Sequence, residues 1–267
     1  MASLLIAWQL RNKNVLIIGG GEIAAQRIDS ILITDANVNV LAPHDGLNLR
    51  VARLIHDHPD RITYHDRLFA GAEELQGMDM VLTALEDTQL SREICDMCRK
   101  SKIPVNAADI PDLCDFYFGS QIRDGPLQVM ISTNGNGPKM ANLVKKKLQS
   151  ALTGVEGSAI AKVGELRAQL KIRAPGVGGE VGKRRMKWMT DVCNTWDMEE
   201  LALLDDTMIQ QLLDDGWGKS RVPTFADLKG TRLQPTSSVG MPFIFGPTLG
   251  FAAGVLITLS VWWIRRK

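Results

Sequence analysis

A glycine-rich turn near the start of the chain has the spacing of a loop that binds phosphate groups. Directly after a short apolar run the sequence reads Gly19-x-Gly21-x-x-Ala24, and a stretch with helical periodicity follows. In such a turn the first glycine allows a sharp change of direction, the second lets the backbone approach a pyrophosphate, and the small third residue lets helix and strand pack closely. The free amides at the start of the helix, those of Glu22 and Ile23, would bind the anion. The pattern predicts a dinucleotide cofactor, and the alternative is a glycine turn that serves only the topology.

A carboxylate that can act as a base follows another predicted strand. Asp109 lies in the stretch VNAADIPDLCDFYFG, residues 105–119, where a strand gives way to a turn. Ligands of open α/β sheets bind outside the carboxyl ends of the strands, so Asp109 is expected on the cofactor's side of the sheet. There a carboxylate can remove a proton while a nicotinamide takes a hydride. The alternative is a turn aspartate that caps Ile110-Pro111.

The second predicted strand lacks the acidic residue that usually binds the ribose of a dinucleotide. The strand ends Leu41-Ala42-Pro43-His44, with Asp45 next, and no arginine follows directly to hold a 2′-phosphate. This favours NAD over NADP as the cofactor. Pro43 and His44 are expected to face the adenosine by their position alone.

Basic residues gather in the second half of the chain. They follow a polar glycine loop at 132–138 and include Lys139, Lys145, Lys146, Lys147, Arg167, Lys171 and Arg173. Residues 138–187 hold twelve lysines and arginines against three acids, whereas residues 189–227 hold nine acids and two bases. The basic block can bind a ligand that carries many carboxylates. The alternatives are a solvated helix face or a membrane-facing patch.

Cysteine and histidine residues offer little further chemistry. The four cysteines do not form a disulfide framework, which fits a reducing compartment. Cys95-x-x-Cys98 lacks a second such pair and lies in a helical pattern, which favours two small helix residues over a redox or metal site. His56-x-His58 is interpreted as part of a solvated loop, and no histidine follows residue 65. No metal site is predicted.

The composition is that of a globular protein. Of the 267 residues, 45% are hydrophobic and 23% are charged, and the net charge is +1. The chain is long enough for one large or two modest domains. A net charge this small gives no sign of nucleic-acid binding.

Strands alternate with helices in the first part of the sequence. Strands are expected at 14–18, 38–41, 62–64, 80–84 and 103–106, with helices at 22–33, 47–56 and 89–100. This alternation predicts a parallel sheet with right-handed crossovers. The later pattern predicts an antiparallel hairpin from 116–123 and 127–133, followed by helices at about 138–153, 157–173, 183–196 and 198–214.

The last part of the sequence has the pattern of a membrane span. Residues 241–264 carry no charge, and the chain then reads Arg265-Arg266-Lys267. A helix of this length would extend ~36 Å, against ~30 Å of bilayer hydrocarbon. We therefore expect a C-terminal transmembrane helix that anchors a cytosolic catalytic part in the mitochondrial outer membrane or the endoplasmic reticulum. The alternative is a buried helix of a soluble domain.

Several of these stretches together resemble the fungal siroheme synthase family and the N-terminal module of bacterial siroheme synthases. The matching stretches are LIIGGGEIAAQR (16–27), VNAADIPDLCDFYFGS (105–120), LQVMISTNGNGPKMANLVKKKL (127–148) and VGELRAQLKIRAP (163–175). The second is highly specific, whereas the first alone would not be. The resemblance spans roughly residues 5–215 and leaves the C-terminal apolar segment outside it.

The resemblance implies a bifunctional enzyme. NAD would accept a hydride from precorrin-2 to give sirohydrochlorin, and ferrous iron, as a substrate, would then enter the macrocycle. Asp109 matches the family's essential aspartate, and the NAD contacts match Glu22, Ile23, Pro43 and His44. Lys139, Lys146 and Arg167 are the expected ligands of the tetrapyrrole carboxylates. Bacterial relatives carry a regulatory serine where this chain has Gly137, so that control is expected to be absent.

The resemblance also implies a homodimer with a swapped dimerisation region. The expected fold class is an α/β protein with an N-terminal Rossmann-like parallel sheet, a small antiparallel dimerisation region, a helical domain and the transmembrane helix. The domains are expected to be NAD-binding at 1–112, dimerisation at 113–150, tetrapyrrole-binding at 151–217, a linker at 218–240 and the tail anchor at 241–264. Two other functions remain open: a dehydrogenase without chelatase activity, and a non-catalytic NAD-sensing membrane adaptor.

Overall fold

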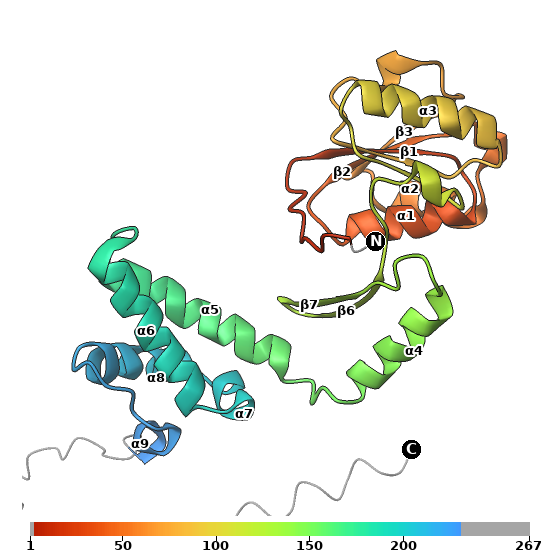
Figure 1. The fold of residues 1–267 in the computed structure, drawn as a ribbon. Coiled ribbons are helices and arrows are strands. Elements are labelled where there is room, and N and C mark those ends of the chain that lie inside the picture. Colours follow the sequence, from red (N-terminus) through yellow and green to blue (C-terminus); the bar gives the residue numbers. More distant parts are fainter. Residues whose placement is uncertain (1–2, 231–267) are drawn as a thin grey trace, which may run out of the picture. The chain divides into compact units, whose positions relative to one another are not determined.

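The fold begins with a parallel sheet covered by helices on both faces. The computed structural model describes residues 3–230 (Figure 1). Its first sheet has the strand order β3-β2-β1-β4-β5, and every pair in it is parallel. The strands are β1 (Asn14–Ile18), β2 (Asn37–Leu41), β3 (Ile62–His65), β4 (Met80–Thr83) and β5 (Val105–Ala107). The predicted Rossmann-like sheet is confirmed, and each strand lies within two residues of its expected place.

Burial on both faces explains why these segments form central strands. Val15 to Ile18 are each no more than 2% exposed, and such continuous apolar runs are typical of parallel strands covered on both sides. On one face Val15 and Ile17 pack with Ile28, and on the other Leu16 and Ile18 pack with Ile94.

The helices therefore divide between the two faces of the sheet. The helices α1 (Glu22–Leu32) and α2 (Leu49–Asp57) cover one face, and α3 (Thr88–Lys100) covers the other (Figure 1). Asn48 caps α2 by accepting from the backbone N–H of Val51, and Asp87 caps α3 by accepting from Leu90. Each cap fixes the point at which a loop at the carboxyl edge of the sheet becomes a helix.

An antiparallel hairpin and a helix follow the parallel sheet. The hairpin consists of β6 (Ser120–Asp124) and β7 (Leu127–Ile131), with Ile122 paired to Val129. The helix α4 (Pro138–Gln149) packs on both strands and buries Ala141. The hairpin predicted around Asp124-Gly125-Pro126 is confirmed.

Helices make up the rest of the described chain. They are α5 (Glu156–Arg173), α6 (Gly179–Thr195), α7 (Met198–Ala202), α8 (Asp206–Gln211), the π-helical turn η4 (Leu212–Trp217) and α9 (Phe225–Gly230). The short 3-10 turns η1 (His44–Gly46), η2 (Ala72–Leu75) and η3 (Pro111–Leu113) lie in the loops of the first sheet. The contacts divide the chain into two compact units, and the boundary between them falls after Asp206. The finer boundaries expected at 112, 150 and 217 stay predictions.

The helix predicted at 198–214 is divided in the structure. It ends first at Ala202, and the backbone N–H of Leu203 bonds to the carbonyl groups of Glu200 and Leu201. A capping box between Asp197 and Glu200 begins α7 only a few residues earlier. Periodicity alone does not reveal such a break, because apolar residues continue on both sides of it.

The predicted transmembrane helix requires a correction to the fold class. Within residues 3–230, none of the helices combines the length and the apolar character that crossing a bilayer requires. The segment expected to span the membrane, 241–264, lies outside the described residues. The fold class that the structure supports is an α/β Rossmann-like domain with an antiparallel hairpin and a helical C-terminal region.

One hydrogen bond joins the hairpin to the start of α5. The backbone N–H of Gly157 donates to the Asp124 carboxylate at 2.8 Å. A Cβ added at Gly157 would lie 2.2 Å from the Asp124 carbonyl oxygen, whereas one added at Gly164, in the same helix, would meet no atom within 4 Å. The close approach at Gly157 therefore requires glycine, whereas the open space at Gly164 does not.

This difference predicts opposite effects for the same substitution in one helix. Gly157→Ala should lower the free energy of unfolding by ~1–3 kcal/mol because the hairpin must move away from α5. Gly164→Ala should raise it by ~0.5–1 kcal/mol because alanine has the higher helix propensity. Chemical denaturation followed by circular dichroism measures both. Equal effects of the two substitutions would contradict the close approach.

Candidate active site

The glycine turn after β1 has the geometry of a dinucleotide-binding loop. Gly19 has a φ of 125°, and a Cβ added there would lie 2.3 Å from the carbonyl oxygen of Ala84 at the end of β4. Gly20 comes similarly close to the loop after β2, because its Cβ would lie 2.6 Å from the carbonyl oxygen of Gly46. These two glycines are required by the protein's own packing.

Gly21 differs from its neighbours because nothing in the described protein requires it to be glycine. A Cβ added there would meet no atom within 4 Å, and its φ of −81° suits any residue. Gly21 is the residue that precedes α1, and no side chain caps the start of that helix. Its bare Cα and the free amides of Glu22 and Ile23 therefore leave room for an anion at the helix N-terminus. This space at the start of α1 fits the pyrophosphate of a dinucleotide.

A cavity of about 700 Å³ opens at the carboxyl edge of the sheet. It lies where the strand order changes direction between β1 and β4, the point at which open α/β sheets bind their ligands. Its lining includes, of the residues predicted from the sequence, Gly19, Gly21, Glu22, Ile23, Pro43 and Asp109. The structure therefore brings the glycine turn, the end of β2 and the end of β5 to one cavity.

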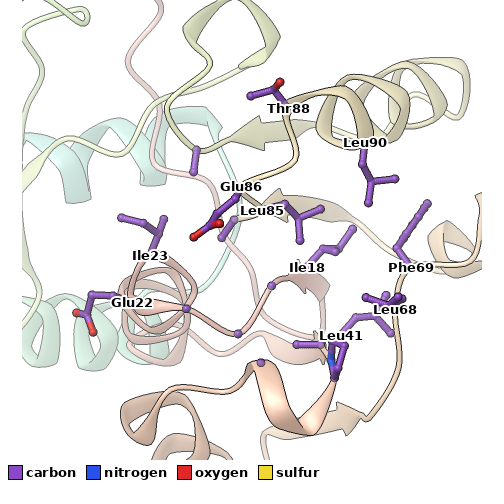
Figure 2. Close-up of a pocket in the computed structure, with 18 of the residues that line it drawn as sticks. Ile18, Glu22, Ile23, Leu41, Leu68, Phe69, Leu85, Glu86, Thr88 and Leu90 are labelled. Carbon is purple, nitrogen blue, oxygen red and sulfur yellow. The ribbon is translucent and has the colours of Figure 1, made fainter.

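Other residues of the lining were not predicted from the sequence. Figure 2 shows the apolar side chains of Leu41, Leu68, Phe69 and Leu90 gathered on one side of the pocket, with Glu86 on the side of Ile23. Leu68, Phe69 and Glu86 follow β3 and β4 in the sequence. Because residues that follow the strands of an open α/β sheet lie at its ligand-binding edge, their positions in the sequence could have identified them as lining residues.

An acidic residue that follows the neighbouring strand lies beside the end of β2, outside the lining of the cavity. Pro43 lines the cavity, while His44 is outside the lining and donates its backbone N–H to the Asp66 carboxylate at 2.7 Å. Asp66 follows β3, the strand beside β2. The segment after β3 thus places a carboxylate next to the end of β2, and that carboxylate already accepts a backbone hydrogen bond.

Asp109 is held in an unusual backbone conformation. Its φ is 59°, a left-handed value that few residues other than glycine adopt, although aspartate and asparagine tolerate it best. Its side chain is exposed and makes no hydrogen bond within the described part of the chain. The alternative of an aspartate that caps Ile110-Pro111 therefore has no supporting hydrogen bond.

The loop around Asp109 is fixed by the two residues that follow η3. The Cys114 thiol donates to the carbonyl oxygens of Ala107 at 3.1 Å and Ile110 at 3.4 Å, on either side of Asp109. Asp115 binds the backbone of Val105 twice, through its carboxylate at 3.0 Å and its own N–H at 2.9 Å. Burial raises the pKa of Cys114, so the thiol stays protonated and remains a donor.

The basic residues predicted to bind substrate are not among the residues that line this cavity. Lys139 and Lys146 lie on α4, Arg167 lies on α5, and all three are exposed and absent from the lining. Their assignment as substrate ligands stays a prediction.

The cysteines of the CxxC pair are buried in α3. Burial raises the pKa of Cys95 to about 11 and that of Cys98 to about 12, which keeps both as unreactive thiols near neutral pH. This agrees with the interpretation of the pair as small helix residues. Across residues 3–230, histidine, cysteine and acidic side chains form no group of three or more suited to holding a metal ion.

Family models and a relative in fission yeast identify the family. Residues 6–120 match a family described as NAD(P)-binding, and residues 124–151 and 155–223 match the central and C-terminal families of sirohaem biosynthesis proteins. The chain is 46% identical to a siroheme biosynthesis protein of Schizosaccharomyces pombe over 85% of this chain and 83% of that protein. The chain belongs to the siroheme biosynthesis protein family. The resemblance identified from the sequence is thereby confirmed.

Two further relatives and one solved structure are also similar to this chain. The chain is 29% identical to a siroheme biosynthesis protein of Saccharomyces cerevisiae over 78% of this chain and 92% of that protein. It is 28% identical to the "Siroheme synthase" of a Psychrobacter species over 70% of this chain but only 37% of that longer protein. The structure called "SirC, precorrin-2 dehydrogenase" shares the fold, with a TM-score of 0.58, 21% identity and coverage of 80% of this chain and 98% of that one.

The two glycines of the turn predict separable effects in this siroheme biosynthesis protein. Gly21→Ala should leave the melting temperature unchanged and weaken NAD binding by about tenfold or more, because the new methyl group fills the space for the pyrophosphate. Gly19→Ala should instead lower the melting temperature, because it places a Cβ against Ala84. Calorimetric titration with NAD and thermal unfolding measure the two. Unchanged NAD binding in Gly21→Ala would contradict the assignment of the start of α1, beside Gly21, as the site of the pyrophosphate.

Proposed function

We propose that this protein oxidises precorrin-2 with NAD and then inserts ferrous iron into the sirohydrochlorin that results. The observation that carries the proposal is the placement of Asp109, an exposed carboxylate without a hydrogen-bonding partner in the described chain, in the lining of a dinucleotide cavity. Membership of the siroheme biosynthesis family supports the choice of a tetrapyrrole as substrate.

Asp109 is the best-placed base among the carboxylates of the cavity. Glu22 is occupied, since Arg50 donates to it at 2.5 Å. Glu86 also lines the cavity but follows β4, whereas Asp109 follows β5 in a loop that the Cys114 and Asp115 contacts hold in place. A carboxylate carried by a fixed loop needs less reorganisation to accept a proton than one carried by a loop that moves.

The same carboxylate can act in both reactions. NAD, when bound, supplies the acceptor for the hydride of the dehydrogenation. Asp109 accepts the proton that must leave a carbon of the macrocycle in that step. In the second reaction two pyrrole protons leave as ferrous iron enters. Asp109, after releasing its first proton to solvent, accepts one of them, and the other passes to solvent. Iron is a substrate in this scheme, and the nitrogens of the macrocycle are its ligands.

The charges around the adenosine side favour NAD over NADP. Arg50 and Arg67 are the arginines that follow the ends of β2 and β3 most closely, and both are engaged in ion pairs, Arg50 with Glu22 and Asp29, and Arg67 with Glu74. Asp66 also places a carboxylate beside His44. A 2′-phosphate there would meet negative charge without an available arginine.

The exposed apolar face of α4 supports a homodimer. Met140, Leu143, Val144 and Leu148 are 40–58% exposed and share one side of the helix. A second copy of the chain would cover this face, as the resemblance to the family implies. A swapped arrangement would also supply Lys139, Lys146 and Arg167 from the second copy to hold substrate carboxylates.

Substitution on this face tests the homodimer directly. Leu143→Asp should convert the protein to a monomer, because the apolar face would then bury a charge in the dimer. Gln149→Asp, an exposed polar position on the same helix, should leave the dimer intact. Sedimentation velocity distinguishes the two species. A wild-type protein that sediments as a monomer would contradict the proposal.

Substitution of Asp109 tests the proposed chemistry. Asp109→Asn keeps the side-chain size and tolerates the left-handed backbone, so the fold should be retained. It removes the base and should lower both the dehydrogenation and the metallation rates by ~10²–10⁴-fold. NAD binding should stay nearly unchanged. Absorbance assays with precorrin-2 and NAD, and with sirohydrochlorin and ferrous or cobalt ion, measure the two rates.

Two matched controls make this result specific. Asp112→Asn changes an exposed carboxylate of the same loop that lies outside the cavity lining, and should leave both rates unchanged. Glu86→Gln changes the competing carboxylate of the cavity and should affect them far less than Asp109→Asn. Full activity of Asp109→Asn with loss in Glu86→Gln would transfer the role of base to Glu86. Loss of dehydrogenation alone in Asp109→Asn would show that the base acts only in that reaction.

A further inference from the structure

Arg27 is a half-buried arginine that has no hydrogen-bond acceptor among the residues the structure describes. It lies on α1, and its guanidinium carbon is 4.3 Å from the centroid of the Phe118 ring. Within residues 3–230 its guanidinium makes neither a hydrogen bond nor an ion pair. The arginines Arg50, Arg61, Arg67 and Arg185 all donate to carboxylates or backbone carbonyl groups. Arg27 therefore differs from these four in being stacked but not hydrogen-bonded.

The structure fixes the position of Arg27 through Phe118. Phe118 packs against the same core as α1 and lies 5.8 Å from Phe116, centroid to centroid. The carbonyl oxygen of Phe116 accepts from the buried Asn106 side chain at 2.8 Å, which ties this segment to β5. The guanidinium therefore rests on an aromatic ring whose own segment is anchored to the sheet, and this arrangement leaves its N–H groups unused.

Arg27 is outside the lining of the cavity, but it lies on the helix α1, whose first residues Glu22 and Ile23 line it. It is one helical turn after Ile23, a residue of the cavity lining, and so shares a side of α1 with it. Burial lowers the pKa of Arg27, while the nearby Cys114 and Asp109 oppose that change. The guanidinium stays charged at neutral pH, because the pKa of arginine starts far above it.

A partly buried cation whose donors have no protein acceptor gains stability from a ligand that supplies acceptors in place of the water it has lost. An arginine presents its N–H groups in a planar fork that matches a carboxylate through paired hydrogen bonds. The proposed substrate carries carboxylates at its ring edges, and the base Asp109 must reach the same macrocycle. A carboxylate held by Arg27 would orient one edge of the ring against Asp109.

We propose that Arg27 is a substrate-binding residue that holds a side-chain carboxylate of the tetrapyrrole beside Asp109. This inference rests on the proposed function. It adds to the exposed lysines of α4 a binding residue inside the cofactor-binding half of the same chain. The competing explanations are that Arg27 binds a phosphate group of the cofactor, or that it only joins α1 to the segment that carries Phe118.

Three variants of the full chain test the proposal. Arg27→Met keeps the apolar stem against Phe118 but removes the charge and the donors. Arg27→Lys keeps the charge without the planar fork. Arg11→Met is the matched control, because Arg11 is an exposed arginine whose partner, Asp35, is 3.6 Å away and also exposed. Spectroscopic titration measures the Kd of sirohydrochlorin, steady-state assays measure KM and kcat for precorrin-2, and calorimetry measures the Kd of NAD.

Arg27→Met should raise the Kd of sirohydrochlorin and the KM of precorrin-2 by about tenfold or more, as expected for loss of a charge-assisted pair. Arg27→Lys should give an intermediate increase. The Kd of NAD should be unchanged in both, and Arg11→Met should behave as the wild type throughout.

Several results would overturn the proposal. An unchanged Kd of sirohydrochlorin in Arg27→Met, together with a lower melting temperature, would show that Arg27 only joins α1 to the segment that carries Phe118. A raised Kd of NAD with unchanged sirohydrochlorin binding would assign Arg27 to the cofactor. A wild-type protein that neither binds sirohydrochlorin nor oxidises precorrin-2 would overturn the proposed function and this inference with it. An active wild type with an unaffected Arg27→Met variant would overturn the inference alone.

Discussion

The close approach of the backbone at Gly19 to the carbonyl group of Ala84 is the constraint on which the site depends. The turn after β1 can pass this near the end of β4 only where no Cβ intervenes. This contact directs the start of α1 toward the carboxyl edge of the sheet, where the loops after β2, β4 and β5 also lie. The space that remains beside Gly21 is then available to a ligand. One steric requirement of the protein thus produces an opening that the described chain itself does not fill.

Near the cavity, some charged side chains are paired within the protein and others are left unpaired. Arg50 and Arg67 are neutralised by carboxylates, and Cys114 stays a neutral thiol that supports a loop. Asp109 and Arg27 lie near each other, and neither has a hydrogen-bonding partner within residues 3–230. Arg27 stacks on a ring and Asp109 lies in a left-handed turn, and two such charges of opposite sign suit a ligand that offers both a carboxylate and a proton.

Much of the first half of the protein could be predicted from the sequence, because its signals are local. Apolar runs of the right length, followed by glycine turns or helical periodicity, specify parallel strands and crossovers. The placement of Gly19, Gly21 and Asp109 at one edge then follows from the topology alone. The specific stretch at 105–120 added the family, which the 46% identity to the fission yeast protein confirms.

Other features depend on contacts between distant segments and could not be predicted in this way. Asp66 reaches His44 from a neighbouring strand, and Arg27 stacks on Phe118 across a wide separation in the sequence. The break after Ala202 interrupts a continuous apolar pattern. The expectation of a transmembrane helix came from the uncharged run at 241–264, its length and the basic residues that follow it, all outside the described residues. The helices within residues 3–230 include none that could cross a membrane.

A structure of the complex with NAD and sirohydrochlorin tests the central claim most directly. We predict that the edge of the macrocycle lies within hydrogen-bonding distance of the Asp109 carboxylate, with a ring carboxylate paired to the Arg27 guanidinium and the pyrophosphate of NAD beside Gly21. A macrocycle bound to the exposed helices alone, with Asp109 facing solvent, would contradict it.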